Sequence, residues 1–225
     1  MIKNKNLQKI KQTGVALSLL LYPLFAGFAF AAHPDLLSLE IGLDVLKKIE
    51  EFHGNTILHF GHFLMLLGVP MLIVIALHFM NKLENSKPWL GWLGGVLASG
   101  GAIVLAVDKA ALCLVPSALD TLSEAQFQQM VPGVEAMFHN QGWLWVLNLL
   151  PLLPVGFILQ GIGLVSSKEM DRKTTIPILI GAILMLNPDI DIIGLVATVF
   201  LAIGFFPYAI QILNKTFTSK SLEVV

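Results

Sequence analysis

Residues 56–80 read TILHFGHFLMLLGVPMLIVIALHFM, a run of 25 residues without Asp, Glu, Lys or Arg. The hydrocarbon core of a bilayer is about 30 Å thick, and roughly 20 apolar residues in a helix are enough to cross it. This run meets both requirements, because it is apolar and long enough. We therefore predict that residues 56–80 form a transmembrane helix.

Apolar runs of similar character flank this helix, at 14–31, 89–115 and 143–165. A double run follows, in which the polar segment 187–191 separates residues 176–186 from residues 192–213. A proline and two carboxylates inside one membrane helix would break its hydrogen bonds and be poorly solvated. The double run is therefore predicted to be a helical hairpin. Its first arm is short, so we expect a thin or partly re-entrant helix there.

The composition favours the same class of protein. Hydrophobic residues make up 56% of the 225 residues and charged residues only 13%, whereas soluble domains carry about a quarter charged residues. We predict an all-α fold, a polytopic transmembrane helical bundle of five or six spans. Residues 33–225 are expected to form its single domain.

The basic residues indicate the orientation of the bundle. Eleven of the fourteen lie in alternate loops and at the chain ends: Lys3, Lys5, Lys9, Lys11, Lys82, Lys87, Lys168, Arg172, Lys173, Lys215 and Lys220. Lysine and arginine in short loops collect on the cytoplasmic side of a membrane. We therefore expect a cytoplasmic C-terminus, in the inner (plasma) membrane of a bacterial-type cell, with membrane lipid as a partner.

The first apolar segment fits two interpretations. A lysine-rich start, an apolar run and the small-residue pattern Ala29-Phe30-Ala31 are typical of a cleavable signal peptide. Residues 1–32 are thus either a signal peptide or the first transmembrane helix. We expect cleavage, which leaves five spans in the mature chain, whereas retention gives six.

The two loops on the outer side are predicted to contain helices that lie on the membrane surface. In the first, Leu36, Leu39, Leu43, Leu46 and Ile49 recur at helical spacing, and Gly54 follows as a helix stop. In the second, Thr121-Leu122-Ser123-Glu124 matches a capping box. Apolar residues then recur at Phe127, Met130 and Val131, which favours two amphipathic interfacial helices.

The 89–115 run carries closely spaced small residues, which are Gly91, Gly94, Gly95, Ala98, Ser99 and Ala102. Small residues let helix backbones approach closely in membranes. We therefore predict that this helix is the central one of the bundle. Such seams also suit a scaffold or accessory subunit, so a homo-oligomer or a partner membrane subunit is a further expectation.

Several classes of function are excluded by residue content. The net charge is −1 and only one arginine is present, so no basic surface for nucleic acid exists and we expect no nucleic-acid partner. The single cysteine, Cys113, excludes a thiol–disulfide relay. A haem held between two spans is disfavoured, because all histidines within the spans lie on the 56–80 helix.

Two histidines one helical turn apart, His59 and His62, indicate a metal site near the outer end of the 56–80 helix. Imidazoles at that spacing can share a first-row metal ion, with a third ligand from elsewhere on the same side. The predicted metal ligands are His59, His62, Asp108 and His139, and the cofactor would be a divalent transition metal. A metal-binding membrane enzyme or metal handler is thus one functional interpretation.

Carboxylates in or near the spans support another interpretation. Ionisable groups at membrane depth are costly and usually functional, and Asp108, Asp189 and Asp191 all fall on the predicted outer side. We predict that they form part of an ion or proton pathway. A small-solute or ion permease is the leading hypothesis, with the metal handler and a non-catalytic scaffold as alternatives. Whether the chain is an enzyme stays open.

Overall fold

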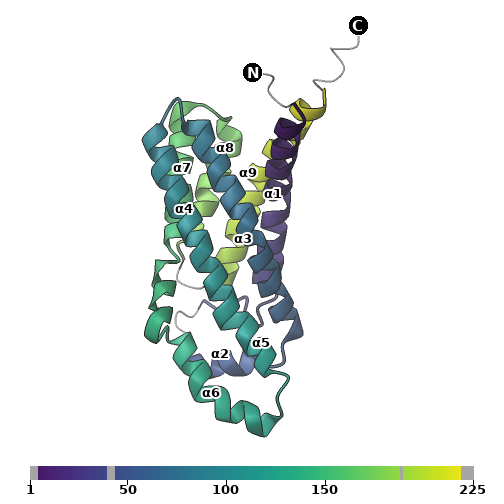
Figure 1. Cartoon of the computed structure of the whole chain (residues 1–225), viewed down its shortest axis with the longest axis vertical. Coiled ribbons are helices and arrows are strands. Elements are labelled where there is room, and N and C mark those ends of the chain that lie inside the picture. The colour runs from purple at the N-terminus through teal and green to yellow at the C-terminus, as the bar shows by residue number, and fades with distance from the viewer. Residues whose placement is uncertain (1–4, 40–43, 188–189, 219–225) are drawn as a thin grey trace.

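The computed structural model describes residues 5–39, 44–187 and 190–218, and every regular element within them is a helix (Figure 1). Six of these helices form the body: α1 (Lys5–Ala31), α3 (Thr56–Leu83), α4 (Pro88–Lys109), α7 (Leu152–Ser167), α8 (Arg172–Leu184) and α9 (Asp191–Thr218). The connecting elements are α2 (Val45–Phe52), a π-helical turn (Ala110–Leu114), α5 (Val115–Leu119), α6 (Glu124–Phe138) and a 3₁₀ segment (Gly142–Leu149).

Five helical segments of the described chain are long and apolar enough to cross a membrane: Lys5–Ala31, Thr56–Leu83, Pro88–Leu119, Gly142–Ser167 and Asp191–Thr218. The prediction of an all-α chain with several candidate spans is confirmed at this level. The predicted hairpin is also present, as α8 and α9, although Pro188 and Asp189 in its turn lie outside the described residues. As expected, α8 is short, because its 13 residues rise only about 20 Å.

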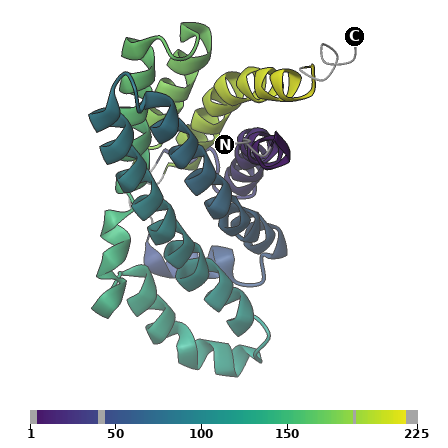
Figure 2. The same ribbon diagram turned by 45° about the horizontal axis from the view of Figure 1, so that its top comes forward.

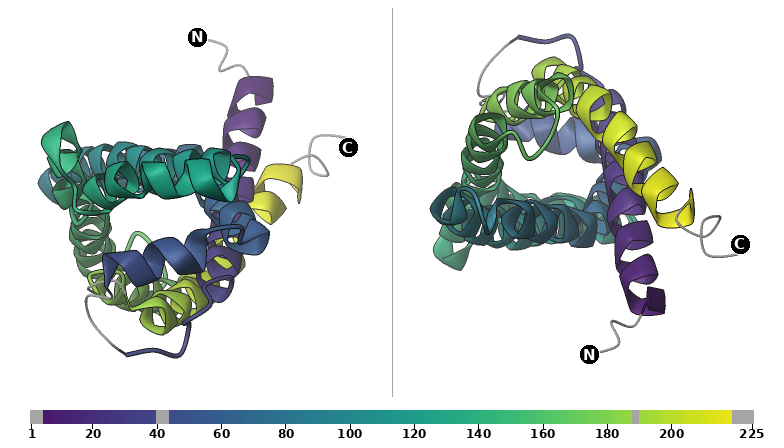
Figure 3. Two further views of the ribbon diagram at one scale, coloured as in Figure 1. Left: turned by 90° about the horizontal axis from the view of Figure 1, so that it is seen from below. Right: turned by 90° about the horizontal axis from the view of Figure 1, so that it is seen from above.

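The six body helices form a closed ring (Figure 3). Each helix packs against the next in the order α1, α3, α4, α7, α8, α9, and α9 packs against α1 again. We call the end of the ring at His33, α2 and α6 the outer end, and the end at Lys82, Lys168 and Lys215 the inner end. No helix of this ring is central, so the prediction that the 89–115 helix occupies the centre is wrong.

The small residues of α4 instead serve two seams, one toward each neighbour in the ring. Gly91 faces Leu83 of α3, whereas a Cβ at Gly101 would overlap the backbone of Leu153 in the first turn of α7. Gln160 of α7 ties the two seams together, because its Nε2 donates to the carbonyl of Ala76 on α3 at 2.8 Å. The sequence pattern therefore indicated close packing correctly but not its direction.

Helix α1 forms a full wall of the ring. Leu19, Tyr22 and Ala26 are buried in the common core, and α1 packs against both α9 and α3. Close approach continues to the end of the helix, where a Cβ at Gly61 of α3 would lie 3.0 Å from the Cα of Ala29. Residues that a signal peptidase would remove are thus part of this core.

Two short helices, α2 and α6, lie together at the outer end (Figures 1 and 2). They share a small cluster of buried side chains, Ile49, Phe127 and Val134. Two predicted details are corrected. Helix α2 begins at Val45 rather than near Leu36, and the capping box is formed by Ser123 and Gln126, two residues after the predicted start. Gly54 adopts a φ of +67° after the C-cap of α2, which is the left-handed conformation that a helix stop requires.

Candidate functional site

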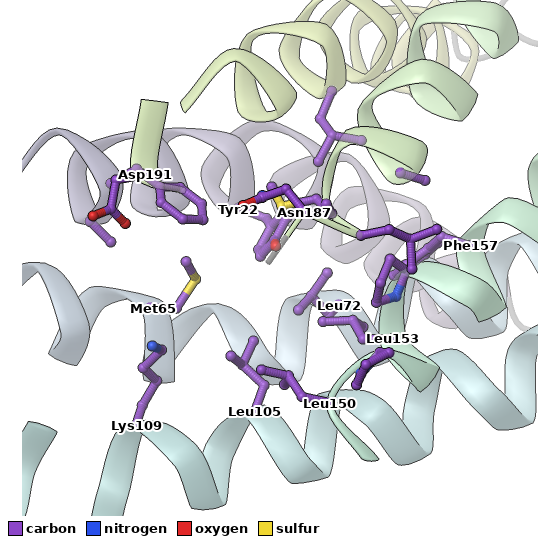
Figure 4. A pocket seen from close by; sticks show the side chains of 18 of the residues that line it. Tyr22, Met65, Leu72, Leu105, Lys109, Leu150, Leu153, Phe157, Asn187 and Asp191 are labelled. Atoms are coloured by element: carbon purple, nitrogen blue, oxygen red, sulfur yellow. The ribbon is translucent and has the colours of Figure 1, made fainter. Parts of the chain in front are cut away.

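The ring encloses a cavity of about 360 Å³ (Figure 4). All six body helices contribute to its wall, and most of the lining side chains are apolar, including Leu72, Leu105, Leu153, Ile178 and Leu201. Tyr22 and Met65 add an aromatic and a thioether surface. Ligand pockets in proteins share this character, with apolar walls and a few polar groups that orient the ligand.

Three phenylalanines close the inner side of the cavity. Phe79 of α3 contacts Phe157 of α7 and Phe205 of α9, with ring centroids 6.4 and 6.2 Å apart. Phe157 and Phe205 line the cavity, and Phe79 is only 1% exposed. We call these three side chains the aromatic barrier, because they come from three different helices and fill the ring at one level.

A second pocket, here called the inner pocket, lies beyond this barrier. Its volume is about 750 Å³, and its wall includes His78 and Tyr208. These two residues lie next to the barrier in sequence, since His78 directly precedes Phe79 and Tyr208 is three residues after Phe205. The Nε2 atom of His78 and the hydroxyl of Tyr208 lie 2.8 Å apart, so a polar contact backs the aromatic barrier on its inner side.

The opposite side of the cavity ends in polar groups. His33 Nδ1 lies 2.9 Å from Asp191 Oδ2, and His33 Nε2 lies 3.1 Å from Nε2 of His62. We call His33, His62 and Asp191 the mouth cluster. The side chains of His33 and Asp191 are 17% and 13% exposed, whereas His62 is 2% exposed. The cluster thus runs from the surface to a buried imidazole on the cavity wall.

One buried nitrogen of the mouth cluster has no hydrogen-bond partner among the described residues. An ionised carboxylate only accepts, so Nδ1 of a neutral His33 carries the proton and Nε2 accepts from His62. The remaining nitrogen of His62, Nδ1, is buried and has no partner among the described residues. A buried polar atom left unpaired costs about 1–3 kcal/mol. The site therefore retains capacity for a polar ligand.

Lys109 extends the polar surface across the mouth, where Figure 4 shows it on the opposite wall from Asp191. Its ammonium group lies 2.9 Å from Asp108 Oδ2. Helix α4 places both residues at its C-terminal end, just before the π-helical turn. The mouth therefore presents two imidazoles, a carboxylate and an ammonium group around an apolar interior.

A separate histidine–carboxylate cluster lies next to α2. Asp120 Oδ1 meets His53 Nδ1 at 2.7 Å, and Asp120 Oδ2 meets His59 Nε2 at 2.8 Å. The Gly54 N–H also donates to Oδ2, at 3.0 Å. We call these residues the Asp120 latch, because one carboxylate joins the end of α2, the start of α3 and the end of α5.

The predicted metal ligands fall into four different contacts. His59 pairs with Asp120, His62 with His33, and Asp108 with Lys109. His139 lies 3.8 Å from Glu135 on α6. No hydrogen bond or ion pair within the described residues joins two of the four, and this ligand set stays a prediction.

The predicted ion pathway is divided in the same way. Asp191 lines the cavity, Asp108 pairs beside it, and Asp189 lies outside the described residues. The sequence reasoning missed His33 and Asp120 as site residues, and also Asp35, which offers a ligand atom within 4.8 Å of ligand atoms of His33 and Asp191. Their position in the sequence could have indicated this. His33-Pro34-Asp35 follows one apolar run and Asp191 begins another, and both ends are predicted on the same side of the membrane.

Fold and cavity together define a class, a helical protein with several candidate membrane spans and an internal ligand cavity. No family model, curated protein or solved structure matches the chain.

Proposed function

We propose that this chain is an integral membrane protein that acts as a small-solute permease, with the cavity as its outward-facing binding site. The observation that carries the proposal is the presence of two pockets toward opposite ends of the ring. The cavity and the inner pocket lie on opposite sides of the aromatic barrier. A carrier needs a binding site near the middle of the membrane and a barrier that can move from one side of it to the other.

The lining suggests the kind of solute. Apolar side chains of all six helices would hold a largely apolar body, and polar groups are concentrated at the mouth. The cavity volume of about 360 Å³ falls within the range of small-molecule sites. A small amphipathic solute, with its polar group at His62 and Lys109, fits this distribution.

A proline next to the barrier provides a point where a helix can bend. Pro207 lies inside α9, two residues after Phe205. Proline in a helix interior removes a backbone hydrogen bond and kinks the helix. Bending at this position would displace Phe205 from Phe79 and connect the cavity to the inner pocket.

The charges support an orientation with the cavity mouth outside the cell. Five lysines line the inner pocket: Lys5, Lys9, Lys82, Lys168 and Lys215. Basic residues favour the cytoplasmic side. On the same grounds we place the protein in the plasma membrane with a cytoplasmic C-terminus. We further propose that α1 is retained, because its removal would open the ring between α9 and α3.

Site-directed cysteine labelling tests this proposal without knowledge of the solute. Cys113 is first replaced by serine, and Leu105→Cys then places one thiol in the cavity (Figure 4). A charged, membrane-impermeant thiosulfonate is applied to right-side-out and to inside-out vesicles. A permease should expose this thiol to both sides, rapidly from the outside and slowly from the inside.

The matched control is Ile103→Cys on the same helix, because Ile103 is 58% exposed on the outer surface of the ring. This thiol should face lipid and resist the charged reagent from both sides. Labelling of Leu105→Cys from the outer side alone would contradict transport and leave a binding protein. Rapid labelling of Ile103→Cys would contradict membrane insertion.

A further inference from the structure

Three potential metal ligands converge beside the mouth cluster. His33, Asp35 and Asp191 each offer one ligand atom, and these atoms all lie within 4.8 Å of one another. His33 and Asp35 belong to the segment that follows α1, whereas Asp191 begins α9. The ring closes between α1 and α9, and this closure brings Asp191 to His33 and Asp35.

We propose that His33, Asp35 and Asp191 bind one divalent first-row transition metal ion, of the Zn²⁺ type, at the outer end of the ring. One imidazole and two carboxylates suit such an ion, and three protein ligands leave a coordination position open for water or solute. The two carboxylate charges balance the charge of the ion. Side chains that are partly exposed give the ion a route in from solution.

His62 is the positioning residue of this site. Its Nε2 lies 3.1 Å from Nε2 of His33, so the other nitrogen of His33, Nδ1, is the one that faces the carboxylate of Asp191. When Nδ1 binds the ion, Nε2–H of His33 donates to His62, which fixes the ring as outer partners of metal ligands do. The Phe52 ring contacts both imidazoles, with centroids 6.1 Å from His33 and 5.7 Å from His62, and further restricts their rotation.

The Asp120 latch also combines histidines with a carboxylate, but its carboxylate oxygens are less available to a metal ion. Both oxygens of Asp120 already accept hydrogen bonds, from His53, His59 and Gly54. Its carboxylate therefore has protein partners on both oxygens. We expect no metal there, and the latch supplies the matched control.

The experiment is a Zn²⁺ titration of the full-length, chelator-treated protein in detergent, against a competing chromophoric chelator. We expect one Zn²⁺ per chain. His33→Gln, Asp35→Asn and Asp191→Asn should each raise Kd on the order of 100-fold, and His62→Gln by about 10- to 100-fold. His59→Gln should leave Kd within about twofold, since the latch is a separate contact.

Size-exclusion elution and Tm are recorded for each variant as controls for folding. If a variant within a helix of the ring does not fold, Asp35→Asn still tests the site, because Asp35 lies in the turn after α1. X-ray absorption at the zinc edge should show one imidazole in the wild type and in His62→Gln alike. Two imidazoles would overturn the positioning role of His62. Absence of saturable binding, wild-type affinity in Asp35→Asn or an equal loss in His59→Gln would overturn the site. None of these readouts depends on transport.

Discussion

The carboxylate of Asp120 holds Nε2 of His59 at 2.8 Å, and this contact fixes the start of α3 to the turn that follows α5. The same carboxylate also holds His53 and the backbone of Gly54. A single side chain thus determines how α2 and α3 meet, directly beside the mouth of the cavity.

Removal of this contact should destabilise the outer end. Asp120→Ala leaves His53 and His59 without their carboxylate, and loss of a partly buried hydrogen-bonded group costs about 1–3 kcal/mol. We expect a lower Tm in detergent and faster hydrogen exchange in α2. Glu135→Ala is the control, because the ion pair of Glu135 with His139 is exposed and long, at 3.8 Å. Equal Tm values for the two variants would contradict the latch.

Two adjacent glycines of α4 should respond in opposite ways to the same substitution. Gly101→Ala places a methyl group against the backbone of Leu153, whereas a Cβ at Gly100 meets nothing within 4 Å. Overpacking costs about 1–3 kcal/mol, and alanine in an open helix position is favourable by up to about 1 kcal/mol. Thermal unfolding should therefore show a loss for Gly101→Ala and no loss for Gly100→Ala. The reverse order would argue against the seam between α4 and α7.

Shortening one side chain of the aromatic barrier should connect the two pockets. Phe79→Ala removes both ring contacts that Phe79 makes with Phe157 and Phe205. In the Leu105→Cys background we expect faster labelling from the inner side, together with a stability loss of about 3–5 kcal/mol. Phe63→Ala, at a position 41% exposed on the same helix, should change neither the labelling rate nor the sidedness.

The mature protein should retain α1. Leu19, Tyr22 and Ala26 are buried against the rest of the ring, so a chain that starts after Ala31 would expose the apolar side chains that α1 covers. The intact mass of C-terminally tagged protein from membranes should include residues 5–31. A mass that corresponds to cleavage after Ala31 would contradict this prediction and support the signal-peptide interpretation.

The sequence was sufficient to predict elements but not their neighbours. Apolar run length predicted the long helices, because hydrocarbon thickness sets a length that any span must meet. The same pattern carried no information about ring order. Gly91 and Gly94 of α4 indicated close approach, yet only the structure shows that Gly91 faces α3 and Gly94 faces Gly156 and Gln160 of α7.

The candidate site was predictable in part for a related reason. His62 was identified by its spacing from His59, but the two residues belong to different clusters. Residues one turn apart lie on one face of a helix, and here His62 contacts His33 whereas His59 contacts Asp120. His33 was missed as a ligand, because the segment before it was interpreted as removable.

Helix α8, with 13 residues, covers less of the length of the cavity than the longer helices of the ring do. The residues that follow it, Met185, Leu186 and Asn187, line the cavity, whereas the neighbouring helix α9 runs for 28 residues. In the orientation proposed above, a solute dissolved in the outer leaflet would reach the cavity from the side at this point. Its occupancy would then follow its partition coefficient between water and lipid, and an apparent affinity measured in vesicles would change with the amount of lipid in the assay.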